Sequence, residues 1–237
     1  PYKDSELGKK QQIAKMFDTI SNEYDGLNRV ISFGIDIKWR NKVVQLVSDT
    51  QPKNILDIAT GTGDLAINLS QTTASQIIGL DISEGMLEVG RKKILNKELQ
   101  NTIDMVVGDS ENLPFDDNSF DAITVAFGVR NFENLEAGLS EILRVLKPGG
   151  IVVVLETSVP TKFPFKQGYY LHSNIVLPLV GKLFSKDKSA YTYLSKSASK
   201  FPYGAAFNNI LNKIGFINSK AHPQTFGVAT IYTATKH

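Results

Sequence analysis

A glycine-rich turn directly after a short apolar run constrains the fold of this chain more than any other feature. The stretch reads ILDIATGTGDLA over residues 55–66. The apolar run is typical of a buried strand, and a helix is expected from about Asp64. Gly61, Gly63 and Ala66 fit the Gly-x-Gly-x-x-Gly/Ala pattern, in which bare backbone approaches a ligand at the end of a strand. The turn suits a dinucleotide and S-adenosylmethionine equally, so hydride transfer and methyl transfer both stay open.

Predicted strands and helices alternate along most of the chain. Residues 1–50 predict helices, because apolar side chains recur every three or four positions. Ser83 is the expected N-cap of a helix that runs to about Asn96. Further strands are expected at 54–59, 76–81, 103–109, 120–128 and 151–156, and further helices at 134–146 and 203–216, with KPGG at 147–150 ending the first of these. Buried strands that alternate with helices predict an α/β fold with a parallel, doubly wound sheet.

The last residues, 217–236, predict two strands joined by a short turn near 225–227. This closing hairpin separates the two readings of the glycine turn, because hydride-transferring Rossmann domains usually add a sixth parallel strand and a separate substrate domain. The 237 residues leave no room for such a second domain. We therefore expect one domain over 1–237, with a helical lid over 1–50 and an insertion over 159–203. The architecture favours methyl transfer.

Three predicted strands in succession end in an aspartate, at the edge of the sheet where ligands bind. Asp57 can orient the glycine turn and the methionine ammonium of the cofactor. Asp81, twenty residues after Gly61, can accept hydrogen bonds from both ribose hydroxyls. Asp109 stands where methyltransferases of this sheet type meet the adenine amino group, and the backbone N–H of Ser110 can meet a ring nitrogen.

A lone aspartate at a strand end says little about a cofactor, because such residues often cap a helix or take part in a turn. The three together with Gly61, Gly63 and the closing hairpin predict a class I S-adenosylmethionine-dependent methyltransferase, with a Rossmann-like seven-stranded sheet that ends in an antiparallel hairpin. No metal site is expected, because the sulfonium is already an activated methyl donor. The chain also has no cysteine, and its three histidines are scattered.

Two stretches resemble the signatures of the C-methyltransferase family of menaquinone and ubiquinone biosynthesis. YDGLNRVISFGIDIKW, residues 24–39, is similar to the N-terminal signature of that family, and RVLKPGGIVVVLETS, residues 144–158, matches its second signature. FGVRN, residues 127–131, resembles a further stretch of the family. The similarity runs from about Phe17 to the C-terminus. Leu27 stands where the family has Met, and Asp36 stands where it has a histidine suited to proton transfer.

The resemblance implies an enzyme that uses S-adenosylmethionine to methylate a ring carbon of a polyprenylated demethylquinol. It implies cofactor contacts at Thr62, Asp81, Asp109 and Ser110. A serine that contacts the cofactor in some relatives is Ala126 here. A naphthoquinol (demethylmenaquinol) and a benzoquinol (a ubiquinone precursor) both fit the motifs. We favour the naphthoquinol, because the chain is compact and shows no mitochondrial transit segment.

Arg130 and Asn131 follow the fourth predicted strand and are the expected catalytic residues, together with Tyr24 from the lid. A guanidinium at this place could hold the developing quinolate oxygen, directly or through a water that accepts the proton, whereas the high pKa of arginine makes it a poor base. The alternative for Arg130 is a surface ion pair with Glu133 or Glu136.

Other residues of the lid are expected to complete the site. Asp25 and Asn28 would extend the polar end that receives the acceptor, and Trp39 and Phe33 would pack the lid helices over the cofactor. His172 lies on an apolar stretch, where a single histidine is more often a packing residue than a catalyst.

The predicted insertion over 159–203 is basic and apolar at once. It holds seven lysines and one acid, Asp187, among large apolar residues: Phe163, Phe165, Tyr169, Tyr170, Leu171 and Leu177. Such a surface suits anionic lipid or an apolar substrate. It could equally pack on its own domain with the lysines in water.

The charge and hydropathy of the chain limit the classes of partner that it is expected to bind. A net charge of +2 is too small to indicate nucleic acid, and no apolar run approaches the roughly 20 residues that span a bilayer. The polar start lacks the apolar core of a signal peptide. We expect a cytoplasmic protein in transient peripheral contact with the membrane that holds its quinol, and we leave a homodimer open. Methylation of another small apolar acceptor, such as a sterol or phenol, and a non-catalytic S-adenosylmethionine-binding scaffold are the alternative functions.

Overall fold

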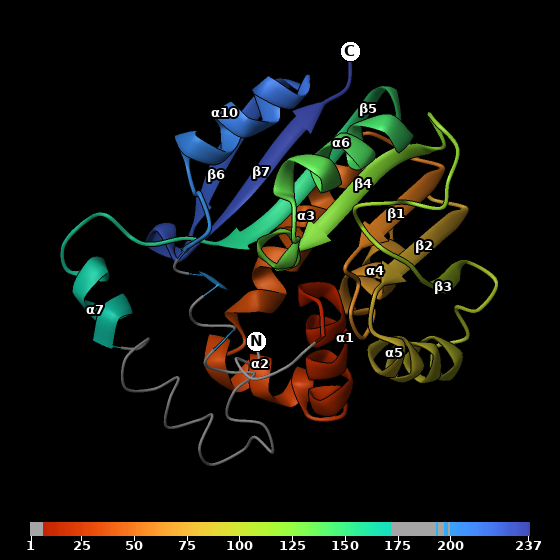
Figure 1. Cartoon of the computed structure of the whole chain (residues 1–237), viewed down its shortest axis with the longest axis horizontal. Helices are drawn as coiled ribbons and strands as arrows, with labels where there is room; N and C mark the ends of the chain where they lie inside the picture. The colour runs from red at the N-terminus through yellow and green to blue at the C-terminus, as the bar shows by residue number, and fades with distance from the viewer. Residues whose placement is uncertain (1–6, 172–192, 194–196, 199) are drawn as a thin grey trace.

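The computed structural model describes residues 7–171, 193, 197–198 and 200–237, and it is built around a seven-stranded sheet (Figure 1). The strand order is β3-β2-β1-β4-β5-β7-β6. The first five strands are parallel, and β7 pairs antiparallel with both β5 and β6. This sheet with its C-terminal hairpin confirms the predicted fold class. The strands are β1 Asn54–Ile58, β2 Gln76–Asp81, β3 Ile103–Val107, β4 Phe120–Ala126, β5 Leu146–Thr157, β6 Ile217–Gln224 and β7 Ala229–Thr235.

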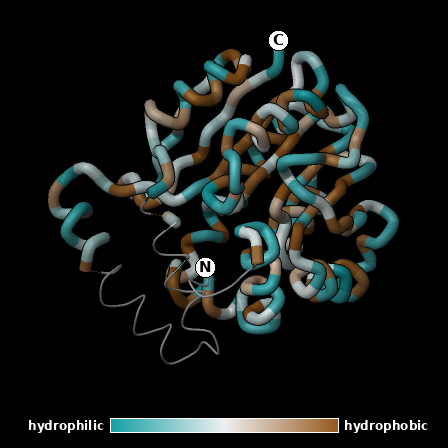
Figure 2. Tube along the Cα trace, viewed as in Figure 1, coloured by the Kyte–Doolittle hydropathy of each residue, from teal (hydrophilic) through white to brown (hydrophobic). Residues whose placement is uncertain are grey.

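Two layers of helices cover the two faces of the sheet, because successive side chains of each strand point to opposite faces. Leu56 and Ile58 of β1 pack with α6 (Leu135–Val145) and α10 (Ala205–Ile214). Ile55 of the same strand packs on the other face, with α3 (Ile35–Ser48), α4 (Asp64–Leu69) and α5 (Glu84–Asn96). Figure 2 shows the hydrophobic residues concentrated along the strands between these layers. The chain therefore folds as a three-layer sandwich.

Helix boundaries follow local signals at most ends. The Ser83 hydroxyl accepts a hydrogen bond from the backbone N–H of Met86, as its predicted N-cap role requires. Helix α6 ends at Val145, and β5 already begins at Leu146, where we expected KPGG to separate the two. The strand starts early because Leu146 pairs with Phe120 of β4, with an irregular register behind it.

Three helices lie in the N-terminal stretch where the sequence predicted a lid: α1 Lys9–Ile20, α2 Tyr24–Ser32 and α3. Met16, Ile20 and Leu27 of α1 and α2 form a buried cluster with Met86 of α5. This packing holds α1 and α2 beyond the carboxyl ends of the parallel strands (Figure 1). The order of the strands reverses between β1 and β4, and a doubly wound sheet binds ligands at such a point.

The predicted insertion is described in part. Helix α7, Phe165–Leu171, follows β5, and the Phe165 ring stacks on Phe226 of the short helix η3, Thr225–Gly227, with 3.8 Å between ring centroids. In the described ranges no helix is long and apolar enough to cross a membrane. Of the residues on which the expectations for the insertion rest, seven lie outside the described ones: His172, Leu177, Asp187 and four of the seven lysines, Lys182, Lys186, Lys188 and Lys196.

Candidate active site

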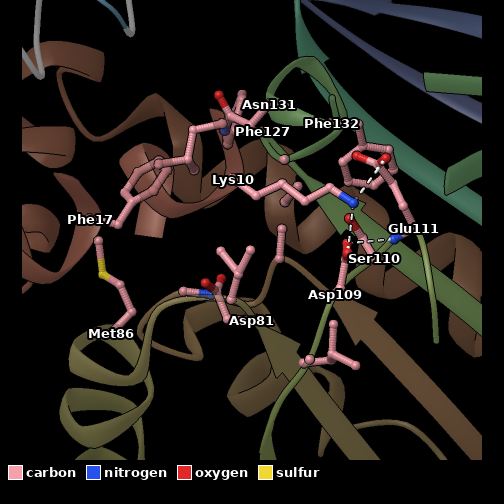
Figure 3. A pocket seen from close by; sticks show the side chains of 18 of the residues that line it. Lys10, Phe17, Asp81, Met86, Asp109, Ser110, Glu111, Phe127, Asn131 and Phe132 are labelled. Atoms are coloured by element: carbon pink, nitrogen blue, oxygen red, sulfur yellow. Dashed lines mark hydrogen bonds and ion pairs between the residues drawn. The ribbon is translucent and has the colours of Figure 1, made fainter. Parts of the chain in front are cut away.

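A pocket lies where the carboxyl ends of β1, β2, β3 and β4 face the lid (Figure 3). It is partly open to solvent, and the empty space among its lining atoms comes to about 680 Å³ when the open part is counted. Ile13, Phe17 and Tyr24 of the lid form its roof. Apolar side chains such as Leu80 and Met86 line it beside a few polar groups, and this mixture is typical of cofactor sites.

The glycine turn presents bare backbone to this pocket. Gly61 has φ +57°, and a Cβ at this residue would meet nothing closer than Tyr24 Cε1 at 4.0 Å. A side chain there would therefore extend into the pocket. Gly63, with φ +77°, faces the protein interior instead, since its Cβ would lie 3.2 Å from Met105 Cε. Of the two predicted glycines, Gly61 lines the pocket and Gly63 lets the turn pack closely on Met105.

Asp57 lies behind the turn. Its buried carboxylate accepts hydrogen bonds from the hydroxyls of Thr60 and Thr124, both at 2.6 Å. Burial raises the pKa of Asp57 to about 6, although the two hydrogen bonds oppose this shift. This geometry suits the predicted role in orienting the loop. The contact with the methionine ammonium stays a prediction, because Asp57 is not among the residues that line the pocket.

Asp81 lines the pocket and ties the turn to the next helix. Its Oδ2 accepts from the backbone N–H of Gly61 at 2.8 Å, and its Oδ1 accepts from that of Ser83 at 2.9 Å. Burial raises the pKa of Asp81, whereas these hydrogen bonds lower it. Each carboxylate oxygen has a second lone pair, so the pre-oriented group can still accept from ribose hydroxyls.

Asp109 and Ser110 line the pocket at the end of β3, where the sequence placed them. The structure adds Lys10 of α1, whose ammonium lies 2.7 Å from Asp109 Oδ2 and 3.2 Å from Glu111 Oε2 (Figure 3). The hydrogen bond to Asp109 raises the pKa of Lys10. Sequence reasoning missed Lys10, because a lysine at the start of a polar helix carries no signal of its own. This ion pair fastens α1 over the pocket.

Arg130 forms an ion pair with Glu156 at the end of β5, so the predicted alternative of a pair with Glu133 or Glu136 is wrong. Both side chains are buried, and Arg130 Nε and Glu156 Oε2 have no hydrogen-bond partner among the described residues. The guanidinium lies 5.9 Å from the ring centroid of Phe127, which lines the pocket. Glu156 was also missed, although it stands inside the second signature stretch.

Asn131 lines the pocket, and its buried Oδ1 has no partner among the described residues. Tyr24 lines the pocket from α2. Burial raises the pKa of the Tyr24 hydroxyl, while the charge of Arg130 and a hydrogen bond with Asn28 lower it, and the pKa stays above its usual value. Tyr24 is therefore a neutral hydrogen-bond donor at physiological pH. Tyr24 and Asn131 thus line the pocket, whereas Arg130 is not among the lining residues and acts on Tyr24 through its charge. The catalytic roles of all three residues stay predictions.

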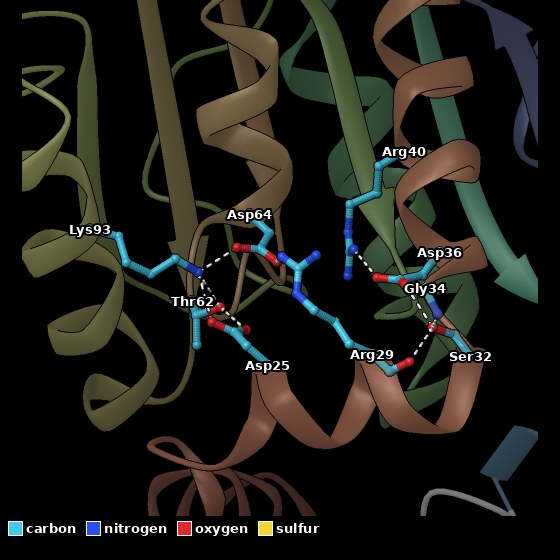
Figure 4. Close-up of polar contacts among 9 residues, drawn as sticks. All are labelled: Asp25, Arg29, Ser32, Gly34, Asp36, Arg40, Thr62, Asp64 and Lys93. Atoms are coloured by element: carbon cyan, nitrogen blue, oxygen red, sulfur yellow. Dashed lines mark hydrogen bonds and ion pairs between the residues drawn. The ribbon is translucent and has the colours of Figure 1, made fainter.

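The other lid residues match their expected places only in part. Trp39 packs against Phe127 with 6.2 Å between ring centroids, in line with its expected packing role. Phe33 is 73% exposed, so the same expectation was wrong for it. Asp36 pairs with Arg40 and accepts from the Ser32 hydroxyl at 2.6 Å (Figure 4). Asp36 therefore has a structural partner in the lid.

The residues present fit S-adenosylmethionine. The pocket offers bare backbone at Gly61, carboxylates at Asp81 and Asp109, and apolar walls between them. The side chain of Met86 and the aromatic ring of Phe17 are suited to the apolar parts of such a ligand. Within the described ranges, no group of three or more histidine, aspartate or glutamate side chains could hold a metal ion.

Comparison with known proteins decides the family. The model of the ubiE/COQ5 methyltransferase family matches residues 5–236. The chain belongs to this family. Its membership confirms the predicted resemblance and the predicted enzyme class, an S-adenosylmethionine-dependent methyltransferase.

Relatives resemble the chain over its full length. A demethylmenaquinone methyltransferase of Bacteroides fragilis is 48% identical over 238 residues, which cover 100% of this chain and 96% of the relative. A ubiquinone/menaquinone biosynthesis C-methyltransferase of Geotalea daltonii is 46% identical, over 99% of this chain and 100% of the relative. A solved SAM-dependent methyltransferase of Thermotoga maritima shares the fold, with a TM-score of 0.66 at 20% identity, over 94% of this chain and 99% of that one.

Proposed function

We propose that this family member methylates a ring carbon of demethylmenaquinol, a polyprenylated naphthoquinol, to form menaquinol. The relatives named for demethylmenaquinone support the naphthoquinol, and those named for both quinones keep the benzoquinol precursor as the alternative acceptor. The observation that carries the proposal is a pocket at the strand ends that is lined by Asp81, Asp109, Tyr24 and Asn131, with the charge of Arg130 close enough to act on the Tyr24 hydroxyl.

The strand ends would hold the cofactor. Asp81 is oriented by two backbone N–H groups and would accept from the ribose hydroxyls, and Asp109 and Ser110 would meet the adenine ring. Thr62 is not among the residues that line the pocket, and its hydroxyl donates to Asp25, so its predicted contact with the cofactor stays a prediction. S-adenosylmethionine supplies a methyl group on a sulfonium, which needs no further activation. The protein would therefore contribute mainly by positioning this methyl group against the acceptor carbon.

The acceptor end would bind the quinol ring and its oxygen. A ring carbon becomes nucleophilic when the neighbouring hydroxyl loses its proton or is strongly hydrogen-bonded. The neutral Tyr24 hydroxyl would donate a hydrogen bond to the quinol oxygen there, and the side-chain amide of Asn131 offers a further hydrogen-bonding group. The charge of Arg130, held by Glu156, would stabilise the negative oxygen that develops.

A single assay tests this function. The purified chain is given isotope-labelled S-adenosylmethionine and either a short-chain demethylnaphthoquinol or the matching benzoquinol, and the labelled product is identified by mass spectrometry. We expect methylation of the naphthoquinol at the higher kcat/KM. The double variant Arg130→Met with Glu156→Leu, which leaves no unpaired buried charge, should bind S-adenosylmethionine within a few-fold of the parent and lose methyl transfer. A chain that bound the cofactor and methylated neither ring would contradict the proposal.

We further propose that the chain meets its quinol from the cytoplasm, through peripheral contact of the α7 segment with anionic membrane. Phe163 is 80% exposed and Leu171 62% exposed, and Lys162 and Lys166 lie in the same segment. Phe163→Ser with Leu171→Ser should reduce sedimentation with vesicles of anionic lipid. Leu95→Ser, at a leucine of α5 that is 63% exposed, is the matched control and should change nothing. Equal binding by all three proteins would refute this contact.

A further inference from the structure

A second polar cluster lies beside the pocket, on the outer side of the glycine turn (Figure 4). The Thr62 hydroxyl donates to Asp25 Oδ1 of α2 at 2.6 Å. Lys93 of α5 donates to Asp25 Oδ2 at 2.8 Å, to the Thr62 hydroxyl at 3.1 Å and to Asp64 at the start of α4. One ammonium thus joins the lid, the turn and two helices, and none of these four residues lines the pocket.

The elements around Lys93 are packed closely enough to make this cluster rigid. A Cβ on Gly90, one turn earlier in α5, would lie 3.2 Å from the backbone of Thr62, so the helix touches the turn there. Thr62 is buried, and the three charged side chains are largely shielded from solvent. Burial raises the pKa of Asp64, yet the hydrogen bond and the charge of Lys93 bring it below its usual value. Charged hydrogen bonds in such partly dry surroundings are stronger than exposed ones.

Two residues of the cluster directly follow a pocket residue in the chain. Asp25 follows Tyr24, whose Cε1 lies over Gly61, and Thr62 follows Gly61 itself. A shift of α2 relative to the turn would therefore move the roof of the pocket away from its bare backbone.

We propose that Lys93 is a positioning residue that locks α2 onto the glycine turn, and so determines how long the cofactor is retained and where Tyr24 stands over it. This inference deepens the proposed function. Only the part that concerns the position of Tyr24 over the cofactor rests on that function. Lys93 acts through Asp25 and Thr62 and touches neither ligand.

The test compares Lys93→Gln with Lys92→Gln, its exposed neighbour on the same helix. Dissociation of S-adenosylmethionine is followed by stopped-flow fluorescence of Trp39, the one tryptophan of the chain, which packs against the pocket residue Phe127. We expect Lys93→Gln to dissociate the cofactor about tenfold faster, since a factor of ten corresponds to about 1.4 kcal/mol, which is the order of one charged hydrogen bond. Lys92→Gln should match the parent.

A double variant separates the lock from simple loss of stability. If Lys93 acts through Asp25, Asp25→Asn with Lys93→Gln should dissociate the cofactor no faster than Lys93→Gln alone, and Lys93→Arg should restore most of the retention. Independent, multiplying effects of the two changes would overturn the inference, as would equal rates for Lys93→Gln and Lys92→Gln. Should Lys93→Gln melt below the assay temperature, Asp25→Asn and Lys93→Arg supply the same comparison. The readout needs no acceptor, so failure to methylate a quinol would refute the proposed function and leave this inference standing.

Discussion

Replacing Glu156 by leucine is expected to destabilise the protein severely, because it leaves Arg130 as an uncompensated charge in the interior. The Arg130 side chain is 9% exposed and that of Glu156 is fully buried, so water screens neither. Removing one partner of a buried pair costs about 3–5 kcal/mol of unfolding free energy. In a chain of this length, this corresponds to a fall in Tm of about 10 °C.

The double variant Arg130→Met with Glu156→Leu should recover most of this loss, because replacing both charges by apolar groups of similar volume is often neutral. Urea unfolding of the parent, the two single variants and the double variant gives the four free energies needed. The recovered protein should still bind S-adenosylmethionine and lack methyl transfer, since the charge that would stabilise the acceptor oxygen is gone. A loss below about 1 kcal/mol for Glu156→Leu, or no recovery in the double variant, would refute the reasoning.

Three further substitutions test the cofactor side of the site. Asp81→Asn should weaken S-adenosylmethionine by about 2 kcal/mol, the scale of a charged hydrogen bond, and unchanged affinity in calorimetry would remove Asp81 from the site. Gly61→Ala should lose about 1 kcal/mol of unfolding free energy, because residue 61 has a φ of +57°. It should lose more free energy of cofactor binding than that, because the added methyl group enters the pocket. Equal losses in urea unfolding and in calorimetry would contradict this. Burial raises the pKa of Asp57 from 3.8 to about 6, so the stability that this group contributes is present below pH 3.8 and is lost as the pH rises through 6. The unfolding free energy of the parent, relative to Asp57→Asn, should therefore fall by about 3 kcal/mol between about pH 4 and pH 7, and a flat difference would show that Asp57 titrates normally.

The sequence by itself determined the fold and which residues at the strand ends line the pocket. Alternating apolar segments fix parallel strands, and the carboxyl ends of such strands share one edge, so Asp81, Asp109 and Gly61 had to converge once the strands were recognised. The N-cap role of Ser83 could be predicted for a similar reason, because the hydrogen bond from the backbone N–H of Met86 to the Ser83 hydroxyl spans only three residues. These inferences succeeded because each depends on neighbours in the chain or on the regular geometry of one sheet.

Only the tertiary structure decided which charged groups meet. The alternative for Arg130 was a pair with Glu133 or Glu136, three or six residues away, but Arg130 pairs with Glu156 on the neighbouring strand β5, 26 residues away. Lys10 and Asp109 are 99 residues apart in the chain, and Lys93 and Asp25 are 68 apart. A charged side chain carries no local pattern that names its partner, because the partner is set by how helices pack on strand ends. The lid therefore had to be seen in place before its ion pairs, and the lock at Lys93, could be recognised.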